Sequence, residues 1–340
     1  MCGHDGHMAT LLGATSLICS HRGAIPSDAV VRLLWQPAEE GGPRGGGAKP
    51  MVEQGCLEGV SEVYGFHNWP KFPLGSIRVA SGPVMARVTD LDITVRGAGC
   101  HASQPSAGDG ADAVLAASHI VVGLQQVTSR SVHYLDSAVV SVSTIHGGEA
   151  RNVLPDEVKL SGTIRTLRDE VCNTVMRRVR EVVAGAAMAG GCTAEVTFTD
   201  LYPALVNSEG PAEAAAAAAK QVLGDGAGVV TSADLPVLGG EDFAFYTKVV
   251  PGCYWFVGTE EDGRENPMLH ATTFDFNDRA LPVGVAMYLR LVDARLGASV
   301  CKAAGVPDLV TPDDFMAAPG AGQDDMAKAA GAGAAGGRTE

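Results

Sequence analysis

The spacing of apolar side chains in the first third of the chain alternates between two periods. Residues 5–18 (DGHMATLLGATSLI) carry apolar side chains at helical spacing, whereas residues 30–36 (VVRLLWQ) form a continuous apolar run that is typical of a buried strand. Residues 61–67 (SEVYGFH) predict a second strand. Helices that alternate with strands in this way favour an α/β layer architecture.

The pattern changes near residue 88, where apolar and polar side chains begin to alternate as they do in a half-exposed strand. Six elements are predicted from there in the order strand, helix, strand, strand, helix, strand, at residues 88–97, 110–130, 137–148, 157–166, 168–188 and 193–199. This order is that of the ferredoxin-like split βαβ unit. We therefore expect a separate domain over residues 87–198.

The α/β pattern returns after this unit. A helix is predicted over residues 210–224, a buried strand over residues 253–259 and a long helix over residues 278–297. The predicted fold class is therefore α/β, with a compact ferredoxin-like unit inserted into a larger α/β domain.

The predicted domain boundaries follow from these changes of pattern. The larger α/β domain is made of residues 1–86 and 199–299, and the inserted unit separates these two segments. Residues 312–340 are rich in Ala and Gly, cannot bury much apolar surface, and are expected to form a disordered tail.

Composition limits the classes of function. The 340 residues include 39 acidic and 25 basic side chains, and the resulting net charge of −14 argues against a nucleic-acid partner. No apolar run is long enough to cross a bilayer, and no secretory signal is visible at the start. We therefore expect a cytoplasmic protein without a membrane partner. The eight cysteines include no CxxC pair and are expected to be free thiols.

Two short segments concentrate side chains that can bind metal ions. Cys2 and His4 lie in CGHDGH, and a thiolate and an imidazole are good ligands for zinc and similar ions. The alternative is that Asp5 caps a helix and the histidines are solvated. Glu39 and Glu40 follow the predicted strand at 30–36, and adjacent carboxylates need a counter-charge that a metal ion would supply. An exposed acidic loop is the alternative for this pair.

Two further histidines follow predicted strands. His67 ends the strand at residues 61–67, and His270 lies in a loop after the strand at residues 253–259. A single histidine at a strand end is more often hydrogen-bonded structure than a metal ligand. Four separate elements, however, bring Cys, His and Glu to strand ends or adjoining loops, which is where open α/β sheets form their sites. The joint pattern therefore predicts a metal centre.

One acidic pair is expected to have a structural role. Glu241 and Asp242 lie at the start of a predicted short helix in GGEDFAFY. Acidic side chains at this position are well explained by capping and by the helix dipole. We therefore assign these two residues no part in catalysis.

Six motifs follow one another along the chain: CGHDGH, QPAEEG, GFHNWP, GCHASQP, ARNVLPDEV with GTIRT, and GEDFAFY. In their order and spacing they resemble the metal-dependent aminoacylase-like amidohydrolases. That family includes hippurate hydrolases, N-acyl-amino-acid amidohydrolases and the plant indole-acetyl-amino-acid hydrolases. The resemblance extends from Cys2 to about Leu296.

The resemblance implies a centre with two divalent metal ions. Zinc or manganese would suit the site, with cobalt and nickel as alternatives. The implied ligands are Cys2, His4, Glu40, His67 and His270. Glu39 would be the general base, and His7 would pack or orient the ligand loop.

The inserted unit resembles the lid domain of that family, which also forms the dimer interface in relatives. We therefore expect a homodimer through this unit. His101 would stabilise the developing oxyanion, in relatives often in the partner subunit's site. Asn152 and Arg165 would bind the amide and the carboxylate of the substrate. From the residues alone, Asn152 in a turn and Arg165 on an exposed strand face are the simpler interpretations.

The implied reaction is hydrolysis of the amide bond of an N-acyl-L-amino acid by a metal-activated water, which gives a carboxylate and a free amino acid. A dipeptidase or exopeptidase with the same centre is one alternative, and an inactive dimerisation or binding module is another. In relatives, about a hundred residues of the α/β domain precede CGHDGH. We therefore expect the chain to lack the N-terminal part of that domain.

Overall fold

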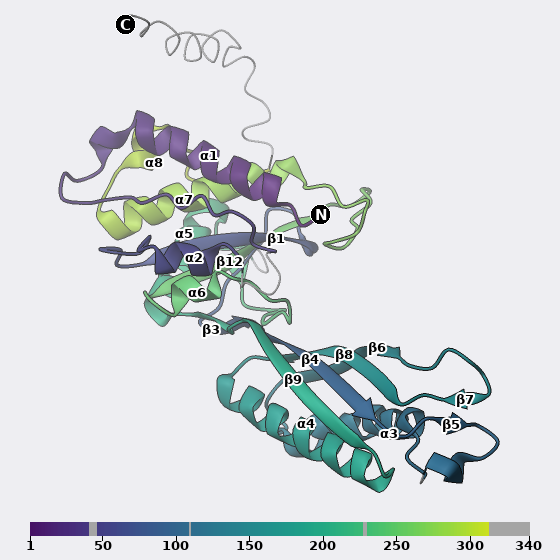
Figure 1. The fold of residues 1–340 in the computed structure, drawn as a ribbon. Helices are drawn as coiled ribbons and strands as arrows, with labels where there is room; N and C mark the ends of the chain where they lie inside the picture. The colour runs from purple at the N-terminus through teal and green to yellow at the C-terminus, as the bar shows by residue number, and fades with distance from the viewer. Residues whose placement is uncertain (41–45, 109, 227–229, 313–340) are drawn as a thin grey trace, which may run out of the picture.

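A computed structural model describes residues 1–40, 46–108, 110–226 and 230–312. Figure 1 shows two units that are joined by the chain between β3 and β4 and by the chain after β9. The first unit is formed by both ends of the described chain, and the second by the middle. The helices of the first unit are α1 (His4–Ser20), α2 (Ala48–Glu53), α5 (Glu209–Leu223), α6 (Ala244–Thr247), α7 (Leu281–Leu296) and α8 (Val300–Ala303). Its strands are β1 (Val63–Pro73), β2 (Ile77–Arg78), β3 (Gly82–Met85), β10 (Leu205–Asn207), β11 (Val230–Thr231) and β12 (Gly252–Glu260).

The first unit is built on a four-stranded sheet with the strand order β1-β12-β2-β11. β1 and β12 are parallel, with His67 opposite Phe256. All but the last of the nine residues of β12 are buried, which confirms the prediction of a buried strand from the run CYWFVGT. Strands that are covered on both faces are expected to be apolar on both sides, as β12 is.

Helices cover this sheet on both faces. Ala-rich α5 and the central part of α7 pack on one face, where Ala215, Trp255 and Val283 belong to one hydrophobic cluster. α1 packs on the outer side of α7, where Ala14 and Ile18 meet Val285 and Leu289. On the other face, α2, α6 and the β3–β10 pair share a cluster with residues of β1 and β12. The mixed α/β fold class is therefore confirmed.

One predicted strand of this unit is wrong. Residues 30–36 form no strand, and both Val30 (78% exposed) and Trp35 (42% exposed) are open to solvent. A strand exists only where its N–H and C=O groups pair with a neighbour, and among the described residues this segment has no strand partner. An apolar run alone is therefore insufficient evidence for a strand.

The second unit contains β4, α3, β6, β8, α4 and β9 in the strand–helix–strand–strand–helix–strand order predicted from the sequence. Their bounds are β4 (Arg87–Arg96), α3 (Ala113–Gln126), β6 (Ala138–His146), β8 (Glu157–Thr166), α4 (Asp169–Ala189) and β9 (Thr193–Tyr202). The sheet is antiparallel in the order β6-β8-β4-β9, so β6 and β9 are its edges. A small pair, β5 (Cys100–His101) and β7 (Val153–Leu154), lies at the end of this unit that is far from the first unit (Figure 1).

Short helical turns also occur among the described residues. They are η1 (Arg22–Ala24), η3 (Pro105–Gly108), the π-helical turn η4 (Val127–Ser131) and η5 (Asp278–Ala280). None of the helices in the described ranges combines the length and apolar character that a membrane span requires. Nearly all of the tail that is expected to be disordered lies outside the described residues.

Each unit has its own hydrophobic core. One cluster draws only on residues between Leu91 and Phe198, whereas the three other clusters use residues up to Met85 and from Leu205 onward. Polar contacts link the units instead. Asp169 at the start of α4 accepts hydrogen bonds from Arg87 (2.9 Å) and from Lys248 (3.4 Å), which follows α6 in the first unit. The division into a catalytic domain and a lid domain remains an interpretation of this arrangement.

Candidate metal centre

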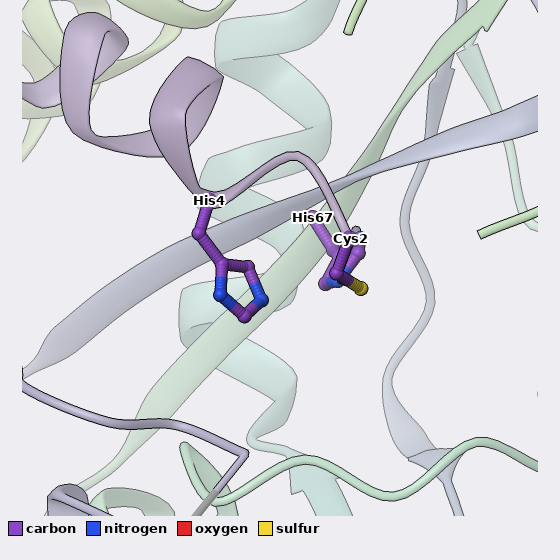
Figure 2. Close-up of side chains that lie close together, drawn as sticks. All are labelled: Cys2, His4 and His67. Atoms are coloured by element: carbon purple, nitrogen blue, oxygen red, sulfur yellow. The ribbon is translucent and has the colours of Figure 1, made fainter. Parts of the chain in front are cut away.

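Cys2 and His4 flank the start of α1. Gly3 between them has φ +93°, a left-handed conformation that glycine adopts without strain, and a Cβ there would lie 2.5 Å from Oδ1 of Asn68. The tight turn directs Cys2 into the interior, where it is only 8% exposed. Figure 2 shows Cys2 close to His67 of β1, with His4 projecting from the start of α1 beside them. Asp5 lies in the first turn, and no side chain caps this helix.

His67 is held as a neutral imidazole in a fixed orientation. Its Nδ1 lies 2.6 Å from the backbone carbonyl of Asn68, and a carbonyl only accepts, so Nδ1 carries the proton. The lone pair of Nε2 is therefore free to face Sγ of Cys2, 3.3 Å away. Burial lowers the pKa of His67 to about 4, so that the ring is uncharged at neutral pH.

His7 lies on α1, about one helical turn after His4, and its ring packs against that of His67. Its ring centroid lies 4.6 Å from that of His67, and its Nε2 lies 2.6 Å from Oδ1 of Asn68. Burial lowers the pKa of His7 well below its ordinary value. The side chain thus packs against His67, and its predicted role in orienting the ligand loop stays a prediction.

Glu39 and Glu40 approach the same place from the loop after residue 36. Oε2 of Glu39 and Oε1 of Glu40 lie 3.6 and 3.7 Å from Nε2 of His4. Oε2 of Glu40 also lies 3.8 Å from Nδ1 of His270, whose backbone N–H donates to the carbonyl of Met1 at 2.8 Å. Cys2 and His270 are far apart in the sequence, and the structure brings them close together in the first unit.

A left-handed backbone conformation occurs at one candidate ligand and at one residue next to the candidate general base. Ala38 has φ +52° and His270 has φ +67°, values that are uncommon for residues with a Cβ. Such conformations cost about 1–3 kcal/mol each and cluster at functional sites. Ala38 directly precedes Glu39, and His270 is itself a candidate ligand.

Potential ligand atoms of these residues form overlapping groups of three, and the atoms of each group lie within 4.8 Å of one another. The groups are Cys2–His4–His67, Cys2–Glu40–His270 and His4–Glu39–Glu40. Burial and the nearby Glu40 and Glu39 raise the pKa of Cys2 to about 12, because a thiolate among carboxylates lacks a counter-charge. One thiol, three imidazoles and a carboxylate fit a divalent transition-metal ion, which would supply that charge.

Sequence reasoning missed the contacts that Glu241 and Asp242 make. Phe243 before α6 makes no side-chain cap, but Oε1 of Glu241 accepts a hydrogen bond from the backbone N–H of Phe243 at 3.1 Å, as expected for an acid at a helix start, whereas the carboxylate of Asp242 turns to more distant partners. Glu241 is 5% exposed and accepts a hydrogen bond from the hydroxyl of Tyr254 at 2.7 Å. Burial and the nearby Glu39 raise its pKa well above the ordinary value. The only sequence signal is a pair of acids before a short helix, and it does not specify such distant partners.

Asp242 holds both ends of the loop that carries Glu39. Its carboxylate accepts hydrogen bonds from Nε2 of Gln36 at 2.7 and 2.9 Å and from the backbone N–H of Ala48 at 2.9 Å. The backbone N–H of Asp242 donates to the carboxylate of Glu39. Burial, with smaller contributions from the nearby carboxylates of Asp242 and Glu40, nevertheless raises the pKa of Glu39 to about 7.

The predicted substrate-binding residues lie in two different places. Arg165 on β8 reaches the first unit, because its Nη1 lies 3.5 Å from the point where a Cβ on Gly240 would be. Tyr202 beside it donates to the backbone carbonyl of Glu39 at 3.1 Å. Burial lowers the pKa of Arg165. His101 and Asn152, in contrast, lie at the distant β5–β7 pair, where Ala102 N–H donates to the Asn152 carbonyl at 2.9 Å (Figure 1).

Comparison with known protein families identifies the group to which this fold and cluster belong. The model of peptidase family M20/M25/M40 matches residues 1–294. The chain belongs to this family. An N-acetylcysteine deacetylase of Bacillus subtilis (strain 168) is 36% identical over 290 residues, which cover 85% of this chain and 72% of the relative. The resemblance stated from the six motifs is therefore confirmed.

Two further M20 relatives are informative. The IAA-amino acid hydrolase ILR1-like 4 of Arabidopsis thaliana is 36% identical over 294 residues, covering 84% of this chain. The matched region spans 64% of that relative's length. A solved structure of the Bacillus subtilis YXEP protein, described as a dinuclear metal binding peptidase from the M20 family, has a TM-score of 0.71 and 32% identity. The match covers 87% of this chain and 73% of the chain in that structure.

Proposed function

We propose that the chain hydrolyses the amide bond of N-acyl-L-amino acids with two divalent metal ions. The observation that carries this proposal is the convergence of the candidate ligand atoms within 4.8 Å in overlapping groups. The ligands would be Cys2, His4, Glu40, His67 and His270. Relatives named for N-acetylcysteine and for IAA-amino acids support this substrate class, since both are N-acyl amino acids.

Held by these five residues, the ions would supply Lewis-acid chemistry: they would polarise the scissile carbonyl and lower the pKa of a water. Glu39 acts as the general base: its carboxylate accepts the proton of the attacking water and delivers it to the leaving amine nitrogen. Zinc or manganese is the expected metal, with cobalt and nickel as alternatives, because the mixed S, N and O donor set suits several ions.

Substrate binding is assigned to Arg165 and Asn152. The guanidinium of Arg165 lies beside the Gly240 segment that carries Glu241 and Asp242, and a fork of N–H donors suits a free carboxylate. Asn152 would hold the amide of the substrate, and His101 would donate to the carbonyl oxygen as it gains negative charge. His101 and Asn152 lie together at the far end of the second unit.

This separation supports a homodimer through the second unit. In the arrangement of Figure 1, the β5–β7 pair is far from the Cys2–His67 cluster of its own chain, so a second copy would have to supply His101. β6 is an open sheet edge, and α3 lies over β6 and β8 with Leu115 (53% exposed) and Val122 (73% exposed) on its surface. An edge strand beside exposed apolar side chains is a suitable pairing surface.

A peptidase with the same centre is the second candidate. A thermostable carboxypeptidase 2 of Saccharolobus solfataricus is 34% identical over 293 residues, covering 85% of this chain and 72% of that protein. The reaction would be the same attack on an amide, with a peptide in place of an acyl group. An inactive dimerisation or binding module is the third candidate.

Metal content and turnover of the 340-residue chain test the proposal together. We expect about two divalent ions per chain after exhaustive buffer exchange, and cleavage of N-acetyl- or N-benzoyl-amino acids in preference to dipeptides. Glu39→Gln should retain the ions and lower kcat by about 10²- to 10⁴-fold, whereas Glu53→Gln on the exposed end of α2 should change neither.

Other outcomes of these measurements would change the assigned base, the substrate class or the metal centre. Full activity of Glu39→Gln would remove Glu39 from the mechanism. Preferential cleavage of dipeptides would favour the peptidase, and bound metal without any hydrolysis would favour the binding module. A chain that binds no metal would contradict the proposed centre.

A further inference from the structure

His101 lies in a tight, hydrogen-bonded turn. Its carbonyl accepts a hydrogen bond from the backbone N–H of Gln104 at 2.8 Å, and its strand pairs with Val153 across the β5–β7 ladder. The thiol of Cys100 lies 3.8 Å from the carbonyl of Pro105, at the other end of this turn. The backbone that carries the imidazole is therefore fixed on both sides, although the side chain itself is exposed.

Ser103 places two donors on one ring nitrogen of His101. Its backbone N–H donates to Nδ1 at 3.2 Å, and its hydroxyl oxygen lies 2.8 Å from the same atom. A backbone amide only donates, so Nδ1 is an acceptor and has no hydrogen of its own in the neutral ring. The hydroxyl can then only donate to it as well. The ring proton must accordingly be on Nε2.

The described chain offers an internal comparison for this arrangement. His133 also accepts a backbone N–H on Nδ1 from the residue two positions later, Leu135, at 3.3 Å. Leucine has no hydroxyl, so His133 has the backbone donor alone. The side chain of Ser103 is the additional element at His101.

We propose that Ser103 is a positioning residue that holds His101 in the Nε2–H tautomer. In this tautomer the free ring nitrogen is a hydrogen-bond donor. A carbonyl oxygen that gains negative charge requires a donor, and a ring with its lone pair on Nε2 would repel it. The tautomer assignment stands on the two contacts to Nδ1, whereas its catalytic consequence rests on the proposed amide hydrolysis.

The tautomer can be measured directly in the full chain labelled with ¹⁵N-histidine. Long-range ¹H–¹⁵N spectra at about pH 8.5, where ordinary histidines are neutral, distinguish a protonated ring nitrogen from an acceptor. His101→Gln identifies the His101 signals. We expect Nε2 to be protonated in the wild-type chain and Ser103→Ala to move the Nδ1 and Nε2 shifts of His101 toward each other. Ser103→Thr, which keeps a hydroxyl, should restore them.

Ser106→Ala is the matched control, because Ser106 lies in the same exposed segment and has no hydrogen bond to His101. It should leave the His101 signals unchanged, and the His133 signals should stay constant in every variant. Identical His101 shifts in the wild-type and Ser103→Ala chains would overturn the proposal, whether or not the chain hydrolyses amides.

Kinetics then test the catalytic consequence. Ser103→Ala should lower kcat by about 2- to 10-fold, the range that one ordinary hydrogen bond supplies, and leave KM and metal content unchanged. A loss confined to KM, or an altered tautomer with unaltered kcat, would overturn the link to catalysis. Absence of any amide hydrolysis in the wild-type chain contradicts the proposed function instead, and the NMR result still decides the role of Ser103.

Discussion

Sγ of Cys2 and Nε2 of His67 lie 3.3 Å apart, although 65 positions separate the two residues in the chain. Cys2 precedes a helix and His67 lies within a strand that is paired along its length with β12. The thiol thus meets a ring whose orientation is already fixed by the Asn68 carbonyl. If these two atoms bind a metal ion as proposed, their fixed geometry would lower the entropic cost of binding.

Removing this thiol should weaken metal binding. Cys2 belongs to two of the ligand groups, so Cys2→Ala deprives both of a donor. In the wild-type chain, zinc at about 100 times its Kd should stabilise the fold by about 2.7 kcal/mol, and a chelator should reverse the rise in Tm. Cys2→Ala should reduce this metal-dependent shift and the metal content per chain. Cys19→Ala, at an exposed thiol on the same helix, should preserve both; equal losses in the two variants would contradict the assignment.

Asp242→Ala should destabilise the first unit. The substitution leaves Nε2 of Gln36 and the N–H of Ala48 without their acceptor, and an unsatisfied buried donor costs about 1–3 kcal/mol. Relief of repulsion with Glu39 offsets part of this cost, so we expect a net loss of about 1–3 kcal/mol in the free energy of unfolding. Chemical denaturation measures it, with Glu53→Ala as the exposed control. A variant as stable as the wild type would show that relief of repulsion between the carboxylates fully offsets the lost hydrogen bonds.

Stability should depend on pH through Glu62 and Arg295. Glu62 precedes β1 and accepts hydrogen bonds from Arg295 at the end of α7, at 2.8 and 2.5 Å, and from the hydroxyl of Tyr64 at 2.7 Å. The hydrogen bond from Arg295 lowers the pKa of Glu62 below its ordinary 4.5. Because the folded state holds the proton less tightly than the unfolded state, the contribution is complete above pH 4.5 and is lost as the pH falls below it.

Glu62→Gln tests this contribution. Since Arg295 is partly exposed, we expect a loss of only about 0.5–1 kcal/mol at pH 7 and a smaller difference between variant and wild type at about pH 3. Urea denaturation at both values measures it, and Glu58→Gln on the same surface loop should show no such pH dependence. A difference that grows toward low pH would have the wrong sign for this ion pair.

Charge placed on α3 should disrupt the proposed homodimer. Val122→Glu adds a carboxylate to the exposed apolar face beside the β6 edge, and sedimentation velocity at micromolar concentration should then report a monomer. Met188→Glu, on an equally exposed apolar side chain of α4, should remain dimeric. A wild-type chain that sediments as a stable monomer would contradict the dimer itself.

The sequence predicted the elements with strong periodicity and failed where structure depends on distant partners. The order of the second unit followed from alternating strands and amphipathic helices, and the candidate ligands from short motifs. The strand at 30–36 was wrong because its apolar run finds no strand partner among the described residues. The two-residue strands β2 and β11 are too short to show a period. Asp242 accepts a hydrogen bond from Gln36, which lies 206 positions earlier in the sequence. Local sequence patterns carry no information about such a pairing.

Among the described residues, the hydrophobic clusters of the two units have no residue in common. A substitution such as a larger side chain at Val140 has to be accommodated by neighbours in the second unit alone, and one at Trp255 by neighbours in the first. Selection can therefore vary the surface of the second unit over generations without repacking the neighbourhood of Cys2 and His67. Positions such as Arg165 and Tyr202, which reach the Gly240 and Glu39 segments of the first unit, are the exceptions, because changes there would act on both units at once.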